Sequence, residues 1–255
     1  HTLNYELSLL VEWLHCNRLS LNLSKTNYML FSRQQKQAIP SINMSGHRLE
    51  RVSCTKFLGV MLDDDLNWKQ HISYTKGKIS KTIGIICKCR KLLNRNTLIN
   101  LYNAFLLPYL LYGIELWAVA NKTSLSPIKV LQKRAIRIIC GVPPRTHTDP
   151  LFQSCDILTL DKLFELRVLE FMYKFNHFML PGVFKDMFTP NSAIHHHYTR
   201  QCYKMHVTHS DTNMIRDTIR YKGTSLWNSL PDNTCNLPNL TQFKTHLRLL
   251  LMNQS

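Results

Sequence analysis

The spacing of apolar residues changes at about residue 66, and this change constrains the fold more than any other feature of the sequence. Residues 1–16 carry an amphipathic helix with a stripe of Leu3, Leu7, Leu10 and Leu14. Short β-rich runs follow, with Ser45-Gly46 as a hairpin turn, at 27–31, 41–44, 48–52 and 56–62. Beyond residue 66 the apolar residues recur at helical spacing. The sequence therefore predicts an α+β protein, mainly α, in which a small antiparallel sheet precedes a helical bundle and a helical C-terminal region.

The helical part divides at clear sequence signals. Its first helix is predicted from 66 to about 93 behind Asp65 as N-cap, with Gly77 and Gly84 as weak points that each cost roughly 1 kcal/mol relative to alanine. Further helices are predicted at 96–107, at 108–117 as a continuation or a kinked third helix, at 125–140 with Pro127 near its first turn, at 159–179 and at 240–251. Gly141-Val142-Pro143-Pro144 marks a break, and residues 180–215 are predicted to be a loop or linker.

Basic charge is concentrated in two of these helical segments. The chain has 32 Lys and Arg against 16 Asp and Glu, a formal charge of +16 at neutral pH. No acidic residue lies between Leu66 and Ile114, whereas eight basic residues do: Lys69, Lys76, Lys78, Lys81, Lys88, Arg90, Lys91 and Arg95. After Glu115 comes a second group: Lys122, Lys129, Lys133, Arg134, Arg137 and Arg145. A solvated lysine-rich surface is the alternative, but such surfaces intersperse both signs, so a helical face that contacts nucleic-acid phosphates is the favoured prediction.

The cysteines and the apolar runs indicate which cellular compartment and which class of partner to expect. The eight cysteines are scattered without a disulfide-dense segment, which favours reduced thiols and a nuclear or cytoplasmic protein. Cys87 and Cys89 point about 200° apart on a helix, so a zinc site there is not expected. Neither a signal peptide nor a run of about 20 apolar residues occurs, so no membrane partner is predicted. Because the sequence begins at His1, inside a predicted helix and without Met, we expect a fragment.

Other candidate chemistry favours structural roles. Asp63-Asp64-Asp65 could bind a metal, but it lies between a strand and a helix, where aspartate favours turns and N-caps. The His195-His196-His197 run has no partner at ligand spacing, so it predicts a polar loop. No metal site is therefore expected. The tryptophans are expected to be core or interface anchors rather than base-stacking platforms: Trp13, Trp68, Trp117 and Trp227.

Four ordered motifs carry a family resemblance. The pattern W-x-x-x-N-x-L-x-L-N-x-x-K-T begins at Trp13, continues to Phe31 and resembles the stretch after the catalytic aspartate pair in reverse transcriptases of LINE-type, jockey-like non-LTR retrotransposons. The segment 57–63 (FLGVMLD) is similar to the family's primer-grip hairpin. Segments 107–117 and 131–139 resemble the thumb and the region after it. The stretch 223–231, through Phe243-Lys244, resembles the ends of such elements.

The resemblance implies a division into functional regions. These are a palm edge with the primer-grip hairpin at 1–65, thumb helices at 66–141, a helical connection at 142–180 and a loop-rich tail with a terminal helix at 181–255. Primer-grip residues would be Phe57, Leu58, Gly59, Val60 and Met61. The nucleic-acid-binding residues would be the first basic group with Lys133, Arg134 and Arg137. Lys25 would be an accessory catalytic residue near the incoming triphosphate.

The resemblance also implies what the fragment lacks. The family's polymerases need two separated aspartate positions that hold two Mg²⁺ ions, and their F/Y-A-D-D motif should precede His1. We therefore expect no cofactor in this fragment, Mg²⁺ in the complete enzyme, and no polymerase activity for the chain alone. Expected partners are RNA and DNA as a primer–template duplex, together with the upstream fingers and palm of the same polyprotein.

Two other functions remain open from the sequence. One is a non-catalytic basic nucleic-acid-binding protein, either a domesticated gene or a relic of a mobile element. The other is a tail that acts as a protein-interaction element through Trp227 and Leu230.

Overall fold

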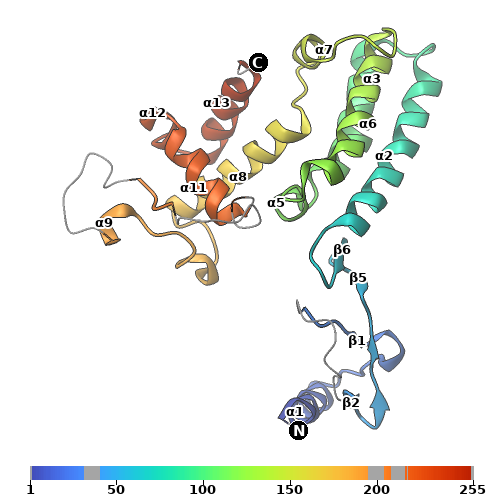
Figure 1. Ribbon diagram of the computed structural model, residues 1–255, viewed down its shortest axis with the longest axis vertical. Helices are drawn as coiled ribbons and strands as arrows, with labels where there is room; N and C mark the ends of the chain where they lie inside the picture. The colour runs from blue at the N-terminus through green and yellow to red at the C-terminus, as the bar shows by residue number, and fades with distance from the viewer. Residues whose placement is uncertain (1, 32–40, 195–203, 208–215, 217, 254–255) are drawn as a thin grey trace. The chain divides into compact units, whose positions relative to one another are not determined.

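The computed structural model describes residues 2–31, 41–194, 204–207, 216 and 218–253, and it is mainly helical, as predicted (Figure 1). Contacts divide the chain into two compact units, His1–His71 and Ile72–Ser255. Among the helices in the described ranges, none is long and apolar enough to cross a membrane. The histidine run at 195–197 lies outside the described residues.

The described residues of the N-terminal unit form one α-helix and three small two-stranded ladders. Helix α1 (Thr2–Cys16) is followed by the 3-10 turn η1 (Leu23–Lys25) and by six strands: β1 (Asn27–Tyr28), β2 (Asn43–Met44), β3 (His47–Arg48), β4 (Glu50–Arg51), β5 (Cys54–Phe57) and β6 (Val60–Asp63). The pairs β2–β3 and β5–β6 are antiparallel, as predicted. The pair β1–β4 is parallel, so the antiparallel prediction is wrong there. The reason is that the β2–β3 hairpin lies within the β1–β4 connection and returns the chain in its original direction.

Two-residue turns close both antiparallel hairpins. Ser45 and Gly46 have φ of 51° and 77°, and Leu58 and Gly59 have φ of 45° and 85°. Positive φ at both central positions matches the right-handed twist of the flanking strands. The Ser45-Gly46 turn is thus confirmed. The β-rich run at 56–62 contains the Leu58-Gly59 turn with parts of β5 and β6, which agrees with a hairpin in this segment.

The predicted leucine stripe of α1 is only partly covered. Leu3 is 53% exposed and Leu10 is 45% exposed, while Leu7 and Leu14 are half-buried. Trp13, on the same helix, is 56% exposed and is therefore not part of the core, unlike the other three tryptophans. The helix is confirmed, but its apolar face lacks a full cover among the described residues.

Helix α2 (Lys69–Cys89) begins four residues beyond Asp65, so Asp65 is not its N-cap as predicted. Asp63 instead accepts the backbone N–H groups that precede the helix. Its Oδ1 accepts from Asn67 at 2.9 Å and its Oδ2 accepts from Trp68 at 3.0 Å. Because these bonds hold the chain in a turn, the helix cannot begin at residue 66.

The next predicted helices form one interrupted stretch. Its parts are α3 (Arg95–Leu101), the π-helical η2 (Tyr102–Leu106), α4 (Leu107–Leu111) and α5 (Ile114–Trp117). Pro108 has no N–H to donate, and in a regular helix its ring would collide with the carbonyl of Ala104, so the backbone widens into a π turn. Gly113, at φ 59°, then separates α4 from α5. The kinked alternative is confirmed.

Helix α6 (Lys122–Cys140) begins three residues earlier than predicted because Asn121 caps it. The Asn121 side chain accepts the N–H of Ser124 at 2.8 Å. Pro127 consequently lies in the second turn, inside the helix, and not near its first turn. Gly141 ends the helix in the left-handed region at φ 67°, which confirms the predicted break.

Two further helices connect α6 to the tail. Helix α7 (Asp149–Ser154) was not predicted, since six residues are too few to show a period. Helix α8 (Leu160–Asn176) matches the prediction at 159–179, and the Thr159 side chain caps it by accepting the N–H of Lys162.

A buried glutamine joins three of these elements. Gln132 is 2% exposed, and its Nε2 donates to the hydroxyl of Tyr102 and to the carbonyl of Leu158, both at 2.9 Å. Its Oε1 accepts the N–H of Leu160 at 2.9 Å. The side chain therefore satisfies polar groups of η2, of the α7–α8 connection and of the start of α8 inside the core.

Two of the C-terminal helices, α11 (Ile219–Ser229) and α13 (Leu240–Asn253), pack on α8 (Figure 1). After the turn η3 (Gly182–Phe184) come α9 (Asn191–Ile194), α11, α12 (Asp232–Cys235) and α13. Phe243 stacks on Tyr173 of α8, with ring centroids 4.5 Å apart, and its centroid lies 6.1 Å from that of Trp227. The predicted terminal helix is confirmed. Trp227 is 7% exposed, so it is mainly a core residue.

Candidate nucleic-acid interface

Helix α2 separates an apolar face from a cationic one. Its isoleucines at 72, 79, 83 and 86 are each at most 5% exposed and form the inner face. Another face carries small, exposed residues at the spacing i, i+4, i+7 and i+11: Ser73, Gly77, Ser80 and Gly84. Exposed lysines lie beside this stripe: Lys76, Lys81 and Lys88. The result is a helix face with little side-chain bulk and a high positive charge.

The lysines of this cationic face have no acidic residue close to them in the sequence and, in the described ranges, none within ion-pair distance. Within the described ranges, the side chains of Lys76, Lys81 and Lys88 form no ion pair and no hydrogen bond. Several acids of the C-terminal unit pair with other cations, for example Asp161 with Lys129 at 2.7 Å. The positive charge of α2 is therefore not neutralised by the described part of the chain and is available to an external anion.

A groove of about 310 Å³ lies between α2 and α6, which we call the α2–α6 groove. Its lining combines small, apolar and basic side chains: Ser80, Ile83, Gly84, Cys87 and Lys88 from α2, and Leu131 and Arg134 from α6. Lys88 and Arg134 come from the two separate basic groups of the sequence. The fold thus brings both groups to one concave surface.

Gly84 leaves the wall of this groove open. A Cβ atom at Gly84 would meet no atom within 4 Å beyond its chain neighbours and the adjacent backbone of α2, and the same holds at Gly77. A phosphate group could therefore come close to the α2 backbone at both positions. The two glycines that sequence analysis treats as weak points of the helix supply room on its cationic face.

Two predicted binding residues have partners inside the protein. Arg95 donates from Nη2 to the hydroxyl of Ser154 at 2.6 Å and to the sulfur of Cys155 at 3.3 Å. Arg137 donates from Nε to the carbonyl of Thr146 at 2.8 Å. Both guanidinium groups thus tie helices to the α6–α7 region.

The other predicted basic residues are mostly exposed. Lys78 is half-buried, with its Nζ 5.4 Å from the ring centroid of Tyr74. The rest lie on α2, on the turn after it or on α6 with exposed side chains: Lys69, Arg90, Lys91 and Lys133.

The β5–β6 hairpin presents an exposed apolar tip in the N-terminal unit. Phe57 is 59% exposed and Leu58 is 76% exposed, whereas Val60 is buried. Leu58 has a φ of 45°, a conformation that costs a branched residue roughly 1–2 kcal/mol. Strain of this kind is typical of functional sites, where it fixes a side chain in one position.

His71 supports this hairpin from the start of α2. The N–H of Met61 donates to Nδ1 of His71 at 3.2 Å. His71 is 3% exposed, and burial lowers the pKa of its imidazole. The ring therefore remains neutral, with Nδ1 as acceptor, and it fixes strand β6 next to the predicted primer-grip residues.

Lys25 lies at the end of a closed turn that its motif builds. The carbonyl of Asn22 accepts the N–H of Lys25 at 3.1 Å and the hydroxyl of Thr26 at 2.9 Å. The hydroxyl of Ser24 donates to Asn22 Oδ1 at 2.7 Å. The spacing N-x-x-K-T thus follows from this turn, which leaves the side chain of Lys25 exposed.

The aspartate run does not fit a magnesium site. Both carboxylate oxygens of Asp63 accept backbone N–H groups, and its side chain is 5% exposed. In the described ranges no three His, Cys, Asp or Glu side chains cluster in a way that could hold a metal ion. Asp63 acts as a turn residue.

Comparison with known proteins gives relatives over more than half of the chain. The RNA-directed DNA polymerase from mobile element jockey of Drosophila melanogaster is 26% identical over 157 residues, 60% of this chain and 17% of that protein. The probable RNA-directed DNA polymerase from transposon BS of the same species is 29% identical over 165 residues, 61% of this chain and 18% of that protein. No protein-family model matches the chain, and no solved structure matches it.

The chain is a distant homologue of non-LTR retrotransposon reverse transcriptases. A third relative, the probable RNA-directed DNA polymerase from transposon X-element of Drosophila melanogaster, is 25% identical over 134 residues. The chain spans less than a fifth of the length of these relatives. The predicted resemblance of the chain to these reverse transcriptases is confirmed.

Two features of the candidate site are absent from the sequence-based predictions. His71 was not singled out, because a lone histidine carries no pattern that reveals a backbone partner ten residues away. The small-residue stripe of α2 had a detectable signal, namely its helical spacing within an acid-free segment. That signal was interpreted only as a loss of helix propensity.

Proposed function

We propose that this chain is the C-terminal part of a retrotransposon reverse transcriptase and binds the primer–template duplex during RNA-directed DNA synthesis. The observation that carries the proposal is the α2–α6 groove, where Lys88 and Arg134 converge beside the open backbone at Gly84. Lysine and arginine on phosphates position a duplex without reading its sequence, as a polymerase requires. The distant homology to mobile-element polymerases supports the same function.

In this proposal the β5–β6 hairpin is the primer grip. Its strained, exposed tip at Phe57 and Leu58 would contact the primer terminus, and the His71 bond to Met61 would hold the strand in register. Lys25 would assist the incoming triphosphate in the complete enzyme as an accessory residue. The helices of residues 66–141 would act as the thumb.

We further propose that the chain alone does not polymerise. Asp63 is occupied by two backbone bonds, so the chain's own aspartate run does not replace the upstream aspartates that would hold Mg²⁺ in the complete enzyme. Primer extension by a longer protein that includes those aspartates would support the polymerase assignment. Duplex binding without extension by that longer protein would favour the non-catalytic alternative.

The test of the groove is a binding titration with a labelled RNA–DNA hybrid, followed by fluorescence anisotropy. The double variant Lys88→Gln/Arg134→Gln should bind about tenfold more weakly and should lower the log-log salt slope by roughly 0.9 for each lost phosphate contact. The control, Lys122→Gln/Lys185→Gln, removes the same charge from exposed positions outside the groove and should change the affinity little. Equal losses in both variants would show that only net charge matters and would overturn the groove assignment.

A further inference from the structure

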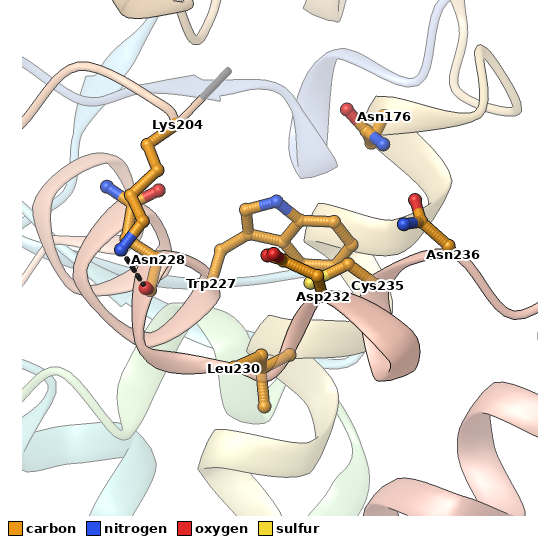
Figure 2. Close-up of a pocket in the computed structure, with 8 residues that line it drawn as sticks. All are labelled: Asn176, Lys204, Trp227, Asn228, Leu230, Asp232, Cys235 and Asn236. Carbon is orange, nitrogen blue, oxygen red and sulfur yellow. Dashed lines mark hydrogen bonds between the residues drawn. The ribbon is translucent and has the colours of Figure 1, made fainter. Parts of the chain in front are cut away.

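A second cavity, of about 410 Å³, lies between α8, α11 and α12 in the C-terminal unit. Trp227 forms its apolar wall (Figure 2). In that view the indole lies between Lys204 and Asn228 on one side and the amides of Asn176 and Asn236 on the other. We call this cavity the Trp227 pocket. It shares no lining residue with the α2–α6 groove.

One side of the pocket is held by internal hydrogen bonds. The amide of Asn228 pairs with the backbone of Met205, donating to its carbonyl at 2.7 Å and accepting its N–H at 3.0 Å. Lys204 Nζ donates to the carbonyl of Asn228 at 3.2 Å. Because the two residues brace each other, this wall is built before any ligand binds, and Lys204 retains donor capacity.

Three exposed polar side chains complete the lining of the pocket. Within the part of the chain that the structure describes, the side chains of Asn176, Asp232 and Asn236 have no hydrogen-bond or ion-pair partner. Two amides and one carboxylate thus surround an indole ring with their hydrogen-bonding capacity unused. Such a set suits a flat ring with donors and acceptors along its edge.

We propose that the Trp227 pocket binds one unstacked nucleobase of a single-stranded nucleic acid. The base would cover the Trp227 indole, its polar edge would meet the free amides, and Lys204 would contact the adjoining phosphate. Asp232 gives the pocket a preference. A carboxylate only accepts hydrogen bonds, so it favours bases with an exocyclic amino group, namely adenine, cytosine and guanine, over uracil and thymine.

This inference rests on the proposed function, since it assumes that the chain binds nucleic acid. It adds a second contact of a different kind: the groove would hold a duplex by its phosphates, whereas the Trp227 pocket would hold an unpaired base. A polymerase that copies RNA handles both forms, the duplex that it has made and the template strand not yet copied. RNA and single-stranded DNA both carry the base edges and the phosphates that the pocket would bind.

The test compares short strands of cytosine–adenine repeats with strands of uracil or thymine only, as RNA and as DNA. The full chain should bind the repeats about tenfold more tightly than the strands that lack amino groups. Asp232→Asn adds a donor and should remove most of this discrimination, while binding of the RNA–DNA hybrid stays unchanged. Asn233→Asp, an adjacent exposed change outside the lining, is the control and should retain the discrimination.

The outcomes separate the two proposals. Equal affinity for the two kinds of strand, or discrimination that survives in Asp232→Asn, would overturn the pocket and leave the groove intact. A stronger preference for the RNA repeats than for the DNA repeats would identify RNA as the ligand, and the reverse would identify single-stranded DNA. If the chain binds neither the hybrid nor the strands, the proposed function itself fails. Asn176→Ala, which should weaken binding of the repeats about fivefold, is a second variant should Asp232→Asn not fold.

Discussion

Helix α8 and all of α2 from Ile72 onward lie in the same C-terminal unit, but the two helices use their charges in opposite ways. On α8, Arg167 bonds to Glu115 and to Glu170, both at 3.0 Å, and Lys244 of α13 reaches Glu170 at 3.3 Å. On α2, the lysines of the cationic face are exposed and have no partner in the described ranges. Charged side chains therefore join helices in one region and have no described partner in the other. A lysine-rich composition alone does not distinguish these two uses.

The largest expected effect breaks the paired charges of α8. Glu170 is 6% exposed and accepts from two cations, so Glu170→Ala should lower the free energy of unfolding by about 2 kcal/mol. Chemical denaturation followed by circular dichroism measures this change.

The matched variant on α2 replaces Lys76, Lys81 and Lys88 by glutamine. It should leave the free energy of unfolding within about 0.5 kcal/mol of the parent, because these side chains have no internal partner to lose. Equal destabilisation by the two variants would contradict the contrast between the helices.

A smaller effect sharpens the role of the small-residue stripe. Gly84→Ala should raise the free energy of unfolding by about 0.5 to 1 kcal/mol, since the new methyl group meets no atom within 4 Å and alanine favours the helix. The same substitution should weaken binding of an RNA–DNA hybrid, because the methyl group occupies space at the groove wall. Ser73→Ala, on the same face but outside the groove lining, serves as the control. Stabilisation with unchanged affinity would show that the nucleic acid does not approach Gly84.

The smallest expected effect concerns pH and the hairpin. Burial lowers the pKa of His71 below its unfolded value, so its contribution to stability is complete above the unfolded pKa of about 6.5 and is lost as the pH falls toward the folded pKa. Protonation would also remove the Nδ1 acceptor for the Met61 N–H. His71→Asn keeps an acceptor near that position and does not titrate. The protection of the Met61 amide against hydrogen exchange should therefore decrease with falling pH in the parent but not in the variant. If the protection of the Met61 amide decreases equally with falling pH in parent and variant, protonation of His71 does not cause the decrease.

Local signals predicted the elements well and their boundaries less well. Periodicity located α6, α8 and α13, but the cap at Asn121 moved the start of α6 and placed Pro127 inside it. The parallel β1–β4 pair could not be predicted, because two-residue strands carry no sequence pattern that indicates which strand they pair with. Gln132 was equally hidden, since a glutamine in a helix looks like a surface residue until the polar groups of Tyr102 and Leu158 surround it.

The candidate site was predictable in its charge but not in its shape. Acid-free segments indicated which residues carry the positive surface, including Lys88 and Arg134. Their meeting in one groove depends on how α2 packs beside α6, which no local pattern encodes. The Trp227 pocket was not predicted at all, because its lining comes from residues spread between 176 and 236.

The π turn at η2 constrains the number of residues that this segment of the chain can contain. Tyr102, Leu106, Leu110 and Ile114 recur at every fourth residue, and all are fully buried. On a regular α-helix that interval would rotate each successive side chain by about 40° away from the previous one. The wider turn absorbs part of this drift. If a residue were inserted or deleted while the winding stayed the same, the residues after it would rotate by roughly 100° on a regular helix, so we expect the segment to tolerate substitutions far better than deletions or insertions.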